Sequence, residues 1–90
     1  MKNVVLVYPT WERAKAKFRE MLDFLGDEIN RSSYMQLVIE LGKTRYRFIN
    51  TDSIDKLLGI QINRLIIEEI NTLTKEQLMF LRTRCEQTNS

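Results

Sequence analysis

Two short apolar runs, one near each end of the chain, constrain the fold more than any other feature. Residues 3–8 read Asn-Val-Val-Leu-Val-Tyr, and residues 64–69 read Arg-Leu-Ile-Ile-Glu-Glu. Uninterrupted β-branched and aliphatic residues are typical of strands that are buried on both faces, as in a parallel sheet. Parallel neighbours must be joined by a crossover, usually a helix. We therefore predict an α/β fold, a small mixed sheet in which two parallel buried strands lie at about residues 3–8 and 64–68.

A helix is predicted directly after the first run. Pro9 and Thr10 end the strand, and the hydroxyl of Thr10 is suited to cap the first turn. Over residues 11–25 apolar side chains recur at helical spacing, and Gly26 is a natural residue to end the helix. The right-handed crossover of a βαβ unit would place this helix on one face of the sheet.

The middle of the chain is predicted to be a loop followed by a β-hairpin. Residues 27–33 are polar and are expected to form the loop. Residues 35–41 and 44–49 each alternate between side chains of different polarity, and Gly42 lies between them. This pattern is typical of two antiparallel strands joined at a glycine turn.

The last third of the chain is predicted to add two short helical segments. A helical turn should run through Leu58, and Thr74 with Gln77 forms a capping-box pair that opens a final helix. The sheet would thus carry two to three helices. We assign residues 1–85 to a single α/β domain and expect residues 86–90 to fray.

The composition is that of an ordinary globular protein and excludes several kinds of active site. The 90 residues are 43% apolar and 29% charged, with a net charge of +2. Histidine is absent and Cys85 is the only cysteine, which excludes histidine-activated nucleophiles, internal disulfides and thiolate metal sites. No apolar run is long enough to cross a membrane. We expect a cytoplasmic protein with no cofactor, no metal and no membrane contact.

The tripeptide Gly42-Lys43-Thr44 matches the end of a phosphate-binding loop but lacks its context. Such a loop needs a glycine five positions before the Gly-Lys pair, where this chain has Leu37. It must also lead from a strand into the amino end of a helix. Because the residues after Thr44 alternate like a strand, we interpret the tripeptide as a hairpin turn.

Glu68 and Glu69 close the second apolar run, and two interpretations of them are open. ATP-driven motors place such a pair at the end of a buried strand, where one carboxylate holds a magnesium-bound water and the other activates the attacking water. The simpler interpretation is that two acidic residues mark the point where a strand emerges into solvent.

Basic and aromatic residues outline a candidate surface for a partner or for nucleic acid. Alternation places Arg45 and Arg47 on one face of one strand, whereas the basic residues of the first helix are interpreted as a solvated face. Trp11 is a candidate for an exposed aromatic side chain, with burial in the core as the default. The candidate surface comprises Trp11, Arg45, Arg47, Arg82 and Arg84.

The order of these segments resembles the ATPase domain of phage terminase large subunits, DNA-packaging motors related to helicases. The resemblance covers nearly the whole chain: Val-Leu-Val-Tyr-Pro-Thr before a helix, the hairpin, Leu-Leu-Gly-Ile, Leu-Ile-Ile-Glu-Glu and Leu-Thr-Lys-Glu-Gln-Leu. It implies a truncated P-loop-like fold. Within it, Glu68 matches the magnesium-associated acid and Glu69 matches the catalytic glutamate.

Several parts of the family pattern have no match in this sequence. In the family, a strand, a phosphate-binding loop and a helix precede the Pro-Thr strand, and a coupling motif and a nuclease domain follow. No Gly-rich loop, loop lysine or magnesium-binding hydroxyl is matched here. Because that loop supplies the amides and the lysine at the transferred phosphate, we predict no independent ATPase activity and a vestigial acidic pair.

The expected function is therefore that of a small phage-type protein, a non-catalytic remnant of a P-loop motor that binds another protein of phage or host. An incomplete sheet leaves edge strands open, so a homodimer is a further expectation. If the chain is phage-encoded, its location would be the host cytoplasm. Two alternatives are open: a nucleic-acid-binding accessory of DNA packaging or replication that uses Lys43, Arg45 and Arg47, and half of a split ATPase that supplies acidic residues in trans.

Overall fold

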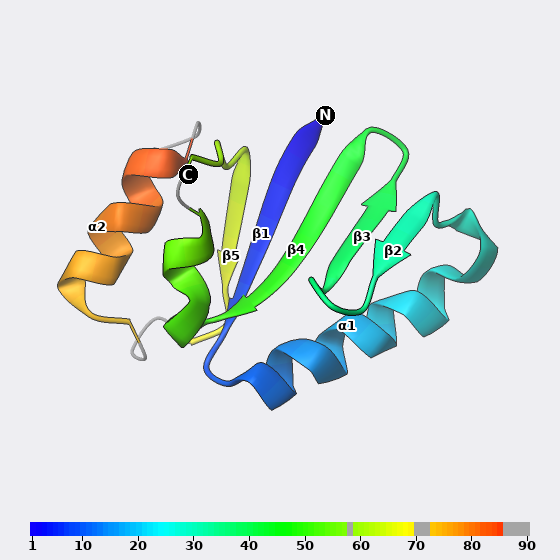
Figure 1. The fold of residues 1–90 in the computed structure, drawn as a ribbon, viewed down its shortest axis with the longest axis horizontal. Coiled ribbons are helices and arrows are strands. Elements are labelled where there is room, and N and C mark those ends of the chain that lie inside the picture. The colour runs from blue at the N-terminus through cyan, green and yellow to red at the C-terminus, as the bar shows by residue number, and fades with distance from the viewer. Residues whose placement is uncertain (58, 70–72, 86–90) are drawn as a thin grey trace.

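The computed structural model describes residues 1–57, 59–69 and 73–85, and its centre is a five-stranded mixed sheet (Figure 1). The strand order is β2-β3-β4-β1-β5. β4 and β5 both run parallel to β1, whereas β2, β3 and β4 pair antiparallel. The strands span Lys2–Tyr8 (β1), Arg31–Ser33 (β2), Val38–Leu41 (β3), Thr44–Asn50 (β4) and Arg64–Ile67 (β5). The predicted α/β class and mixed sheet are confirmed, and β4 of the hairpin proves to be a third parallel strand.

β1 is buried on both faces, as its sequence predicts. Val5 and Val7 pack into one hydrophobic cluster, while Leu6 and Tyr8 pack into the other. Successive side chains of a strand point to opposite faces, so each cluster lies on its own side of the sheet. β1 is an inner strand between β4 and β5, and helical segments pack on both of its faces.

β5 departs from the prediction of a strand buried on both faces. Leu65 and Ile67 pack against a cluster, but Ile66 between them is 41% exposed. β5 is the last strand in the sheet order, and helix α1 (Trp11–Leu25) packs mainly on β4, β1 and β3. An apolar run therefore indicated a buried strand where the structure has an edge strand with one covered face.

Helix α1 (Trp11–Leu25) has the predicted bounds. The Thr10 hydroxyl caps it by accepting a hydrogen bond of 3.2 Å from a backbone N–H of the first turn. Gly26 ends it with φ +55°, a left-handed conformation that favours glycine. Ala14 and Phe18 are fully buried, so the apolar stripe of the helix faces the sheet.

The segment between α1 and β4 is where the sequence prediction was wrong. Residues 27–33, predicted as a loop, contain part of the 3-10 helix η1 (Gly26–Glu28) and strand β2. β3 begins at Val38 rather than Met35 because Leu37 has φ +51°, which interrupts an extended chain. As a result Leu37 is buried, whereas Met35 is 92% exposed.

The glycine turn of the hairpin is confirmed. Gly42 and Lys43 are the two residues between β3 and β4, and Gly42 has φ +60°. Tight two-residue hairpin turns require a positive φ at their first residue, and glycine is favoured there for that reason.

The opposite face of the sheet carries the 3-10 helix η2 (Thr51–Leu57) and helix α2 (Lys75–Arg84). The predicted capping box of α2 is confirmed. The Gln77 backbone N–H donates to the Thr74 hydroxyl (3.1 Å), and the Thr74 backbone N–H donates to Gln77 Oε1 (3.0 Å). Leu81 of α2 is buried in the cluster that contains Val5 and Val7.

Two predicted chain features lie outside the described residues: the end of the helical turn at Leu58 and the frayed tail, residues 86–90. Within the described ranges, no helix is long and apolar enough to span a membrane.

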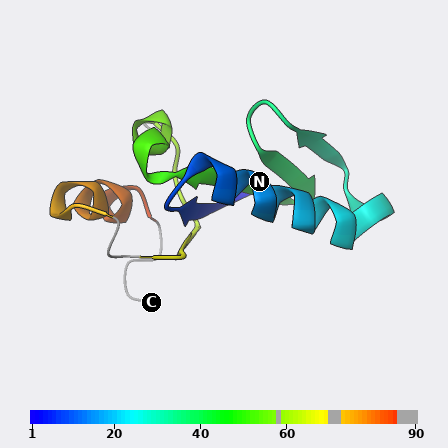
Figure 2. The same cartoon turned by 90° about the horizontal axis from the view of Figure 1, so that it is seen from below.

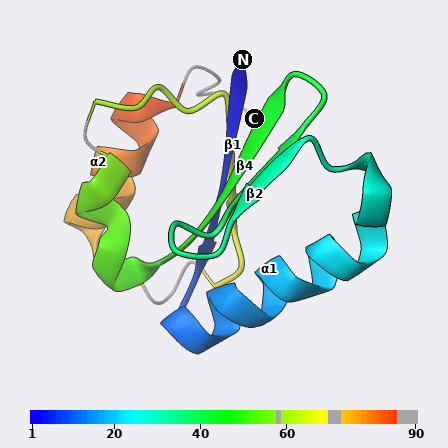
Figure 3. The same cartoon turned by 45° about the vertical axis from the view of Figure 1, so that its right-hand side comes forward.

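The helices cover the two faces of the sheet at opposite ends (Figure 3). α1 lies on one face over β3, β4 and β1, whereas η2 and α2 pack on the other face over β1, β5 and the end of β4. No described helix covers this second face at β2, β3 and the first half of β4. In Figure 2, η2 and the β2–β3 hairpin project to the same side of the molecule. The sheet therefore offers one open face, which extends over β2, β3 and the first half of β4 as far as η2.

Candidate functional site

The acidic pair lies at the carboxyl edge of the sheet, by which we mean the side where the parallel strands β1, β4 and β5 reach their C-terminal ends. Glu68 directly follows β5, and its backbone N–H donates to the Val7 carbonyl of β1 (3.0 Å). Ligands of open α/β sheets commonly bind at the carboxyl ends of the strands. The position of Glu68 is therefore compatible with the role that the resemblance implies.

The carboxylate of Glu68, however, is already held by Arg13 from the first turn of α1. Arg13 Nε donates to Oε1 (3.1 Å) and Oε2 (3.0 Å), and Arg13 Nη2 donates to Oε1 (2.7 Å). These hydrogen bonds keep the pKa of Glu68 below its usual value and raise the pKa of Arg13. A carboxylate in such a fork is oriented toward the guanidinium and not toward an incoming ion.

Arg13 was missed because it was grouped with the solvated basic residues of the helix. The position of Arg13 in the sequence is a signal that could have found it. A helix that directly follows a parallel strand begins at the carboxyl edge of the sheet, so its first turn lies beside the end of β5. Glu69 is exposed next to Glu68. Among the described residues, no group of three histidine, cysteine, aspartate or glutamate side chains could hold a metal ion.

The Gly42-Lys43 turn lies at the opposite edge of the sheet from the acidic pair. The Lys43 carbonyl accepts a hydrogen bond from the Lys2 backbone N–H (2.9 Å), at the beginning of β1. Glu68, by contrast, bonds to Val7 near the end of the same strand. The turn and the acidic pair therefore cannot form one nucleotide site in this fold.

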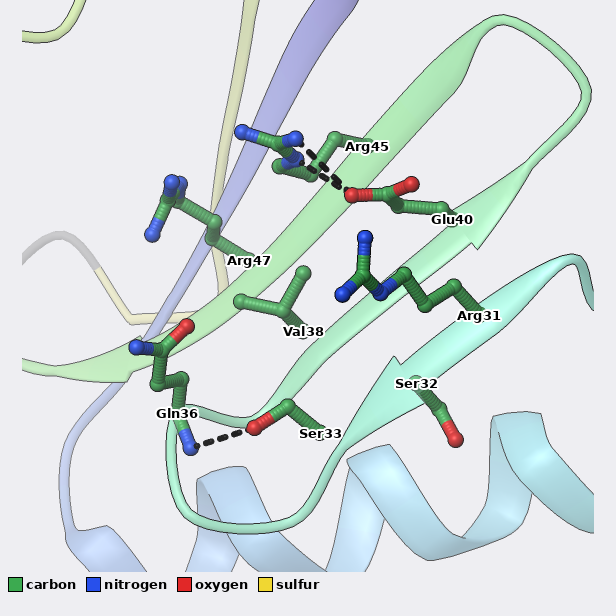
Figure 4. Close-up of a pocket in the computed structure, with 8 residues that line it drawn as sticks. All are labelled: Arg31, Ser32, Ser33, Gln36, Val38, Glu40, Arg45 and Arg47. Carbon is green, nitrogen blue, oxygen red and sulfur yellow. Dashed lines mark hydrogen bonds and ion pairs between the residues drawn. The ribbon is translucent and has the colours of Figure 1, made fainter.

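A second candidate surface is the open face over β2, β3 and β4, which we call the arginine face. Two rows of side chains that lie opposite one another on neighbouring strands cross it: Arg31, Glu40 and Arg45, then Ser33, Val38 and Arg47. With Gln36 of the β2–β3 loop, these residues line a hollow of about 370 Å³ (Figure 4). Arg45 and Arg47 share one face of β4, as the alternation predicted.

The charges of the arginine face are unbalanced. Arg45 Nε donates to Glu40 Oε2 (2.9 Å), and Arg45 Nη2 lies 2.8 Å from the same oxygen. Arg47 Nε is buried and has no hydrogen-bond acceptor among the described residues. Burial, and then the charge of Arg45, lower the pKa of Arg47, while Glu40 acts in the opposite direction. The fold therefore gives Arg47, which lines the hollow, no acceptor for its Nε, and a buried N–H without an acceptor costs about 1–3 kcal/mol.

A second hollow adjoins the first and shares Gln36 and Arg47 with it. It measures about 240 Å³ and lies between the start of α1, the β2–β3 loop and η2. Trp11 lines it and is 41% exposed. The other polar or flexible side chains along it are Met35, Asn50, Ser53 and Lys56. The structure thus brings Trp11 and Arg47 to one continuous surface.

The arginines predicted on the last helix lie elsewhere. Arg82 is exposed on α2, which η2 separates from β4 (Figure 1). The side chain of Arg84 lies outside the described part of the chain. Arg31 and Lys56, which the prediction did not include, belong to segments that the sequence patterns did not assign to a sheet face. No local pattern marks them, because only the pairing of β2 with β3 and the position of η2 bring them to this surface.

Comparisons with protein-family models, with curated proteins and with solved structures found no match to this chain. The resemblance to terminase ATPase domains therefore depends on the order of the sequence motifs described above.

Proposed function

We propose that this chain is a non-catalytic binding protein whose arginine face receives an anionic partner. The observation that carries this proposal is the placement of Arg45 and Arg47 on one face of β4, where both line the same hollow and Arg47 Nε has no acceptor in the described structure. Guanidinium groups bind carboxylates and phosphates through charge-assisted, often bidentate hydrogen bonds. A partner that supplies such groups would complete the hydrogen bonding of this face.

The acidic pair supports the non-catalytic part of the proposal. Glu68 could hold a magnesium-bound water only if the Arg13 fork first opened, and the Gly42-Lys43 turn is at the far edge of the sheet. The same fork argues against a half-site that supplies Glu68 in trans. Purified protein with magnesium and ATP should release no phosphate above the blank. Release that disappears in Glu69→Gln would contradict this.

We further propose descent from the middle of a terminase-like motor domain, with a phage or host protein as a partner in the host cytoplasm. The parallel neighbours β1 and β5, the helix after Pro9-Thr10 and the acidic pair at the end of β5 support this. Affinity capture from infected cells is the test, performed with wild type and with Arg31→Ala/Arg47→Ala. A specific protein partner should be captured with the wild type. Its loss in the double variant would place its contact on the arginine face, and retention by both proteins would place the contact elsewhere.

A second candidate function, self-association through strand β5, is favoured by the exposure of Ile66. This side chain is 41% exposed on the edge strand of the sheet and lies beside Leu6 in the parallel register. Exposed edges can accept a further strand from a second copy. Sedimentation should then show a dimer that Ile66→Thr weakens. A strict monomer at high protein concentration would remove this candidate.

The arginine face itself is tested with generic polyanions. We expect polyglutamate and inorganic polyphosphate to bind the wild-type protein at low salt and to be released as salt is raised. Arg31→Ala/Arg47→Ala should abolish this binding, while Arg82→Ala, which removes an exposed arginine from α2, should not. Equal binding by wild type and the double variant would contradict the proposal.

A further inference from the structure

We propose that the occupant of the arginine face is a single-stranded nucleic acid, with phosphates on the arginines and a base against Trp11. This inference depends on the proposed function, because it names the anionic partner of the same surface. Proteins that bind single strands combine a positively charged groove, which follows the backbone, with aromatic side chains on which bases stack. Both features are present here on adjoining hollows.

The cations of the surface form a series rather than a single cluster. Arg31 lies on β2, Arg47 on β4 and Lys56 on η2, so positive charge extends across three elements. The one carboxylate among them, Glu40, is already bonded to Arg45. A chain of regularly repeated phosphates matches such a series better than one phosphorylated side chain, which would use one or two of these cations.

Arg47 links the charged part of the surface to its aromatic part. It lines both hollows, and Trp11 lines the second. A phosphate on Arg47 would therefore lie next to a base on the indole. Polar groups for the base or sugar are also present: Ser53 donates its hydroxyl hydrogen to Asn50 Oδ1 (2.6 Å), which leaves the Asn50 amide N–H groups as donors beside this hollow.

The aromatic component favours a single strand over a duplex or an acidic protein. In a duplex the base faces are stacked on one another and only their edges are accessible in the grooves. Carboxylates of an acidic protein would use the arginines but have no aromatic ring to stack on Trp11. Binding of a single strand thus makes use of both hollows.

Trp11 is the only tryptophan of the chain, so its fluorescence reports directly on the proposed contact. The probe is an oligothymidylate of about 12 nucleotides, within the usual site size of such proteins. The controls are an abasic phosphodiester of the same length, a duplex of the same length and polyglutamate. We expect the oligothymidylate to bind in a salt-dependent manner and to quench Trp11. The abasic strand should bind more weakly and leave the fluorescence unchanged.

Variants separate the role of the arginines at the phosphates from that of Trp11 at the base. Arg31→Ala and Arg47→Ala should each lower the slope of log affinity against log salt by about 0.7 for every phosphate that the variant no longer neutralises. The matched control Arg82→Ala should leave the slope unchanged. Trp11→Ala should weaken oligothymidylate roughly tenfold, the effect of removing one stacked base, and leave abasic binding unchanged. Trp11→Phe should recover most of that affinity, which distinguishes stacking from misfolding.

The inference would be overturned by oligothymidylate binding without quenching of Trp11, by a duplex bound as tightly as the single strand, or by equal losses of affinity in Arg47→Ala and Arg82→Ala. Binding of polyglutamate without binding of oligothymidylate would also reject it, while leaving the proposed function in place for an acidic protein partner. If no polyanion binds, both proposals fail.

Discussion

Arg13 Nη2 lies 2.7 Å from Glu68 Oε1, and this contact joins the first turn of α1 to the residue that follows β5. Arg13 Nε completes the fork by donating to both carboxylate oxygens. The two residues follow neighbouring parallel strands, so the pair closes the carboxyl edge between β1 and β5. An acidic residue that the sequence associates with magnesium chemistry is here part of a contact between two elements of the fold.

Glu68→Gln tests this contact through its pH dependence. Because Arg13 holds the pKa of Glu68 below its usual value near 4.5, the ionised pair stabilises the folded state above that pH. This contribution is lost as pH falls through the lowered pKa. We therefore expect Glu68→Gln to lower the free energy of unfolding at neutral pH, and the difference from wild type to shrink in acid. Urea denaturation at about pH 7 and about pH 3 measures this.

The matched control is Asp23→Asn, which removes an exposed carboxylate from the same helix as Arg13. It should leave stability nearly unchanged at both pH values. A difference between Glu68→Gln and wild type that is the same at both pH values would show that the pair does not stabilise the fold.

Phe18→Ala tests the packing of α1 on the sheet. Phe18 is fully buried and meets the rings of Phe48 (5.7 Å between centroids) and Tyr34 (5.0 Å) edge to face. Removing a buried ring of this kind costs about 3–5 kcal/mol. Phe24→Ala, on the same helix but 88% exposed, should change stability by less than about 0.5 kcal/mol. Similar losses of stability in the two variants, measured by denaturant unfolding, would contradict the placement of the helix.

Gly42→Ala tests the interpretation of the Gly-Lys-Thr tripeptide as a turn. Its φ of +60° is a conformation that costs an alanine about 1–2 kcal/mol, although no atom lies close enough to clash with an added Cβ. We expect a lower melting temperature in this variant. Lys43→Ala should have no comparable effect, since Lys43 is exposed. A large stability loss in Lys43→Ala with none in Gly42→Ala would reverse this interpretation.

Arg47→Met should separate stability from binding. The variant removes a partly buried guanidinium whose Nε has no acceptor in the described structure, so the unbound protein should be as stable as wild type or more stable by up to about 1 kcal/mol. Polyanion binding should weaken at the same time. Arg45→Met should instead destabilise the fold, because it leaves the largely buried Glu40 carboxylate without its partner. Thermal unfolding of the three proteins without ligand gives the comparison, and a destabilised Arg47→Met would contradict it.

The sequence predicted those parts of the fold that local chemistry determines. Thr10, Gly26, Gly42 and the Thr74–Gln77 pair each have a specific hydrogen bond or backbone conformation, and all of them lie where they were expected. The parts that depend on tertiary pairing were missed. β2 is polar and short, whereas β5 is apolar but lies at an edge of the sheet. The composition of these two strands therefore does not indicate where they lie in the sheet.

The same distinction applies to the candidate sites. Alternation correctly placed Arg45 and Arg47 on one face, but nothing in the local sequence associates Arg31 or Lys56 with them. The small net charge of +2 does not by itself indicate an anionic partner, because a sum over the chain does not show that three arginines gather around one carboxylate. Likewise, Arg13 could be paired with Glu68 only after β1 and β5 were known to be neighbours.

The most direct test of the proposed binding surface is an NMR titration that follows the arginine Nε–Hε signals as inorganic polyphosphate is added. Arg47 Nε has no acceptor in the described structure, whereas Arg13 Nε is already bonded to Glu68. We predict that the Arg31 and Arg47 signals shift with a common affinity, while those of Arg13 and Arg82 stay in place. Shifts confined to Arg13 would place the anion at the acidic edge of the sheet and contradict the assignment of the arginine face. The absence of any shift at Arg47 would contradict it equally.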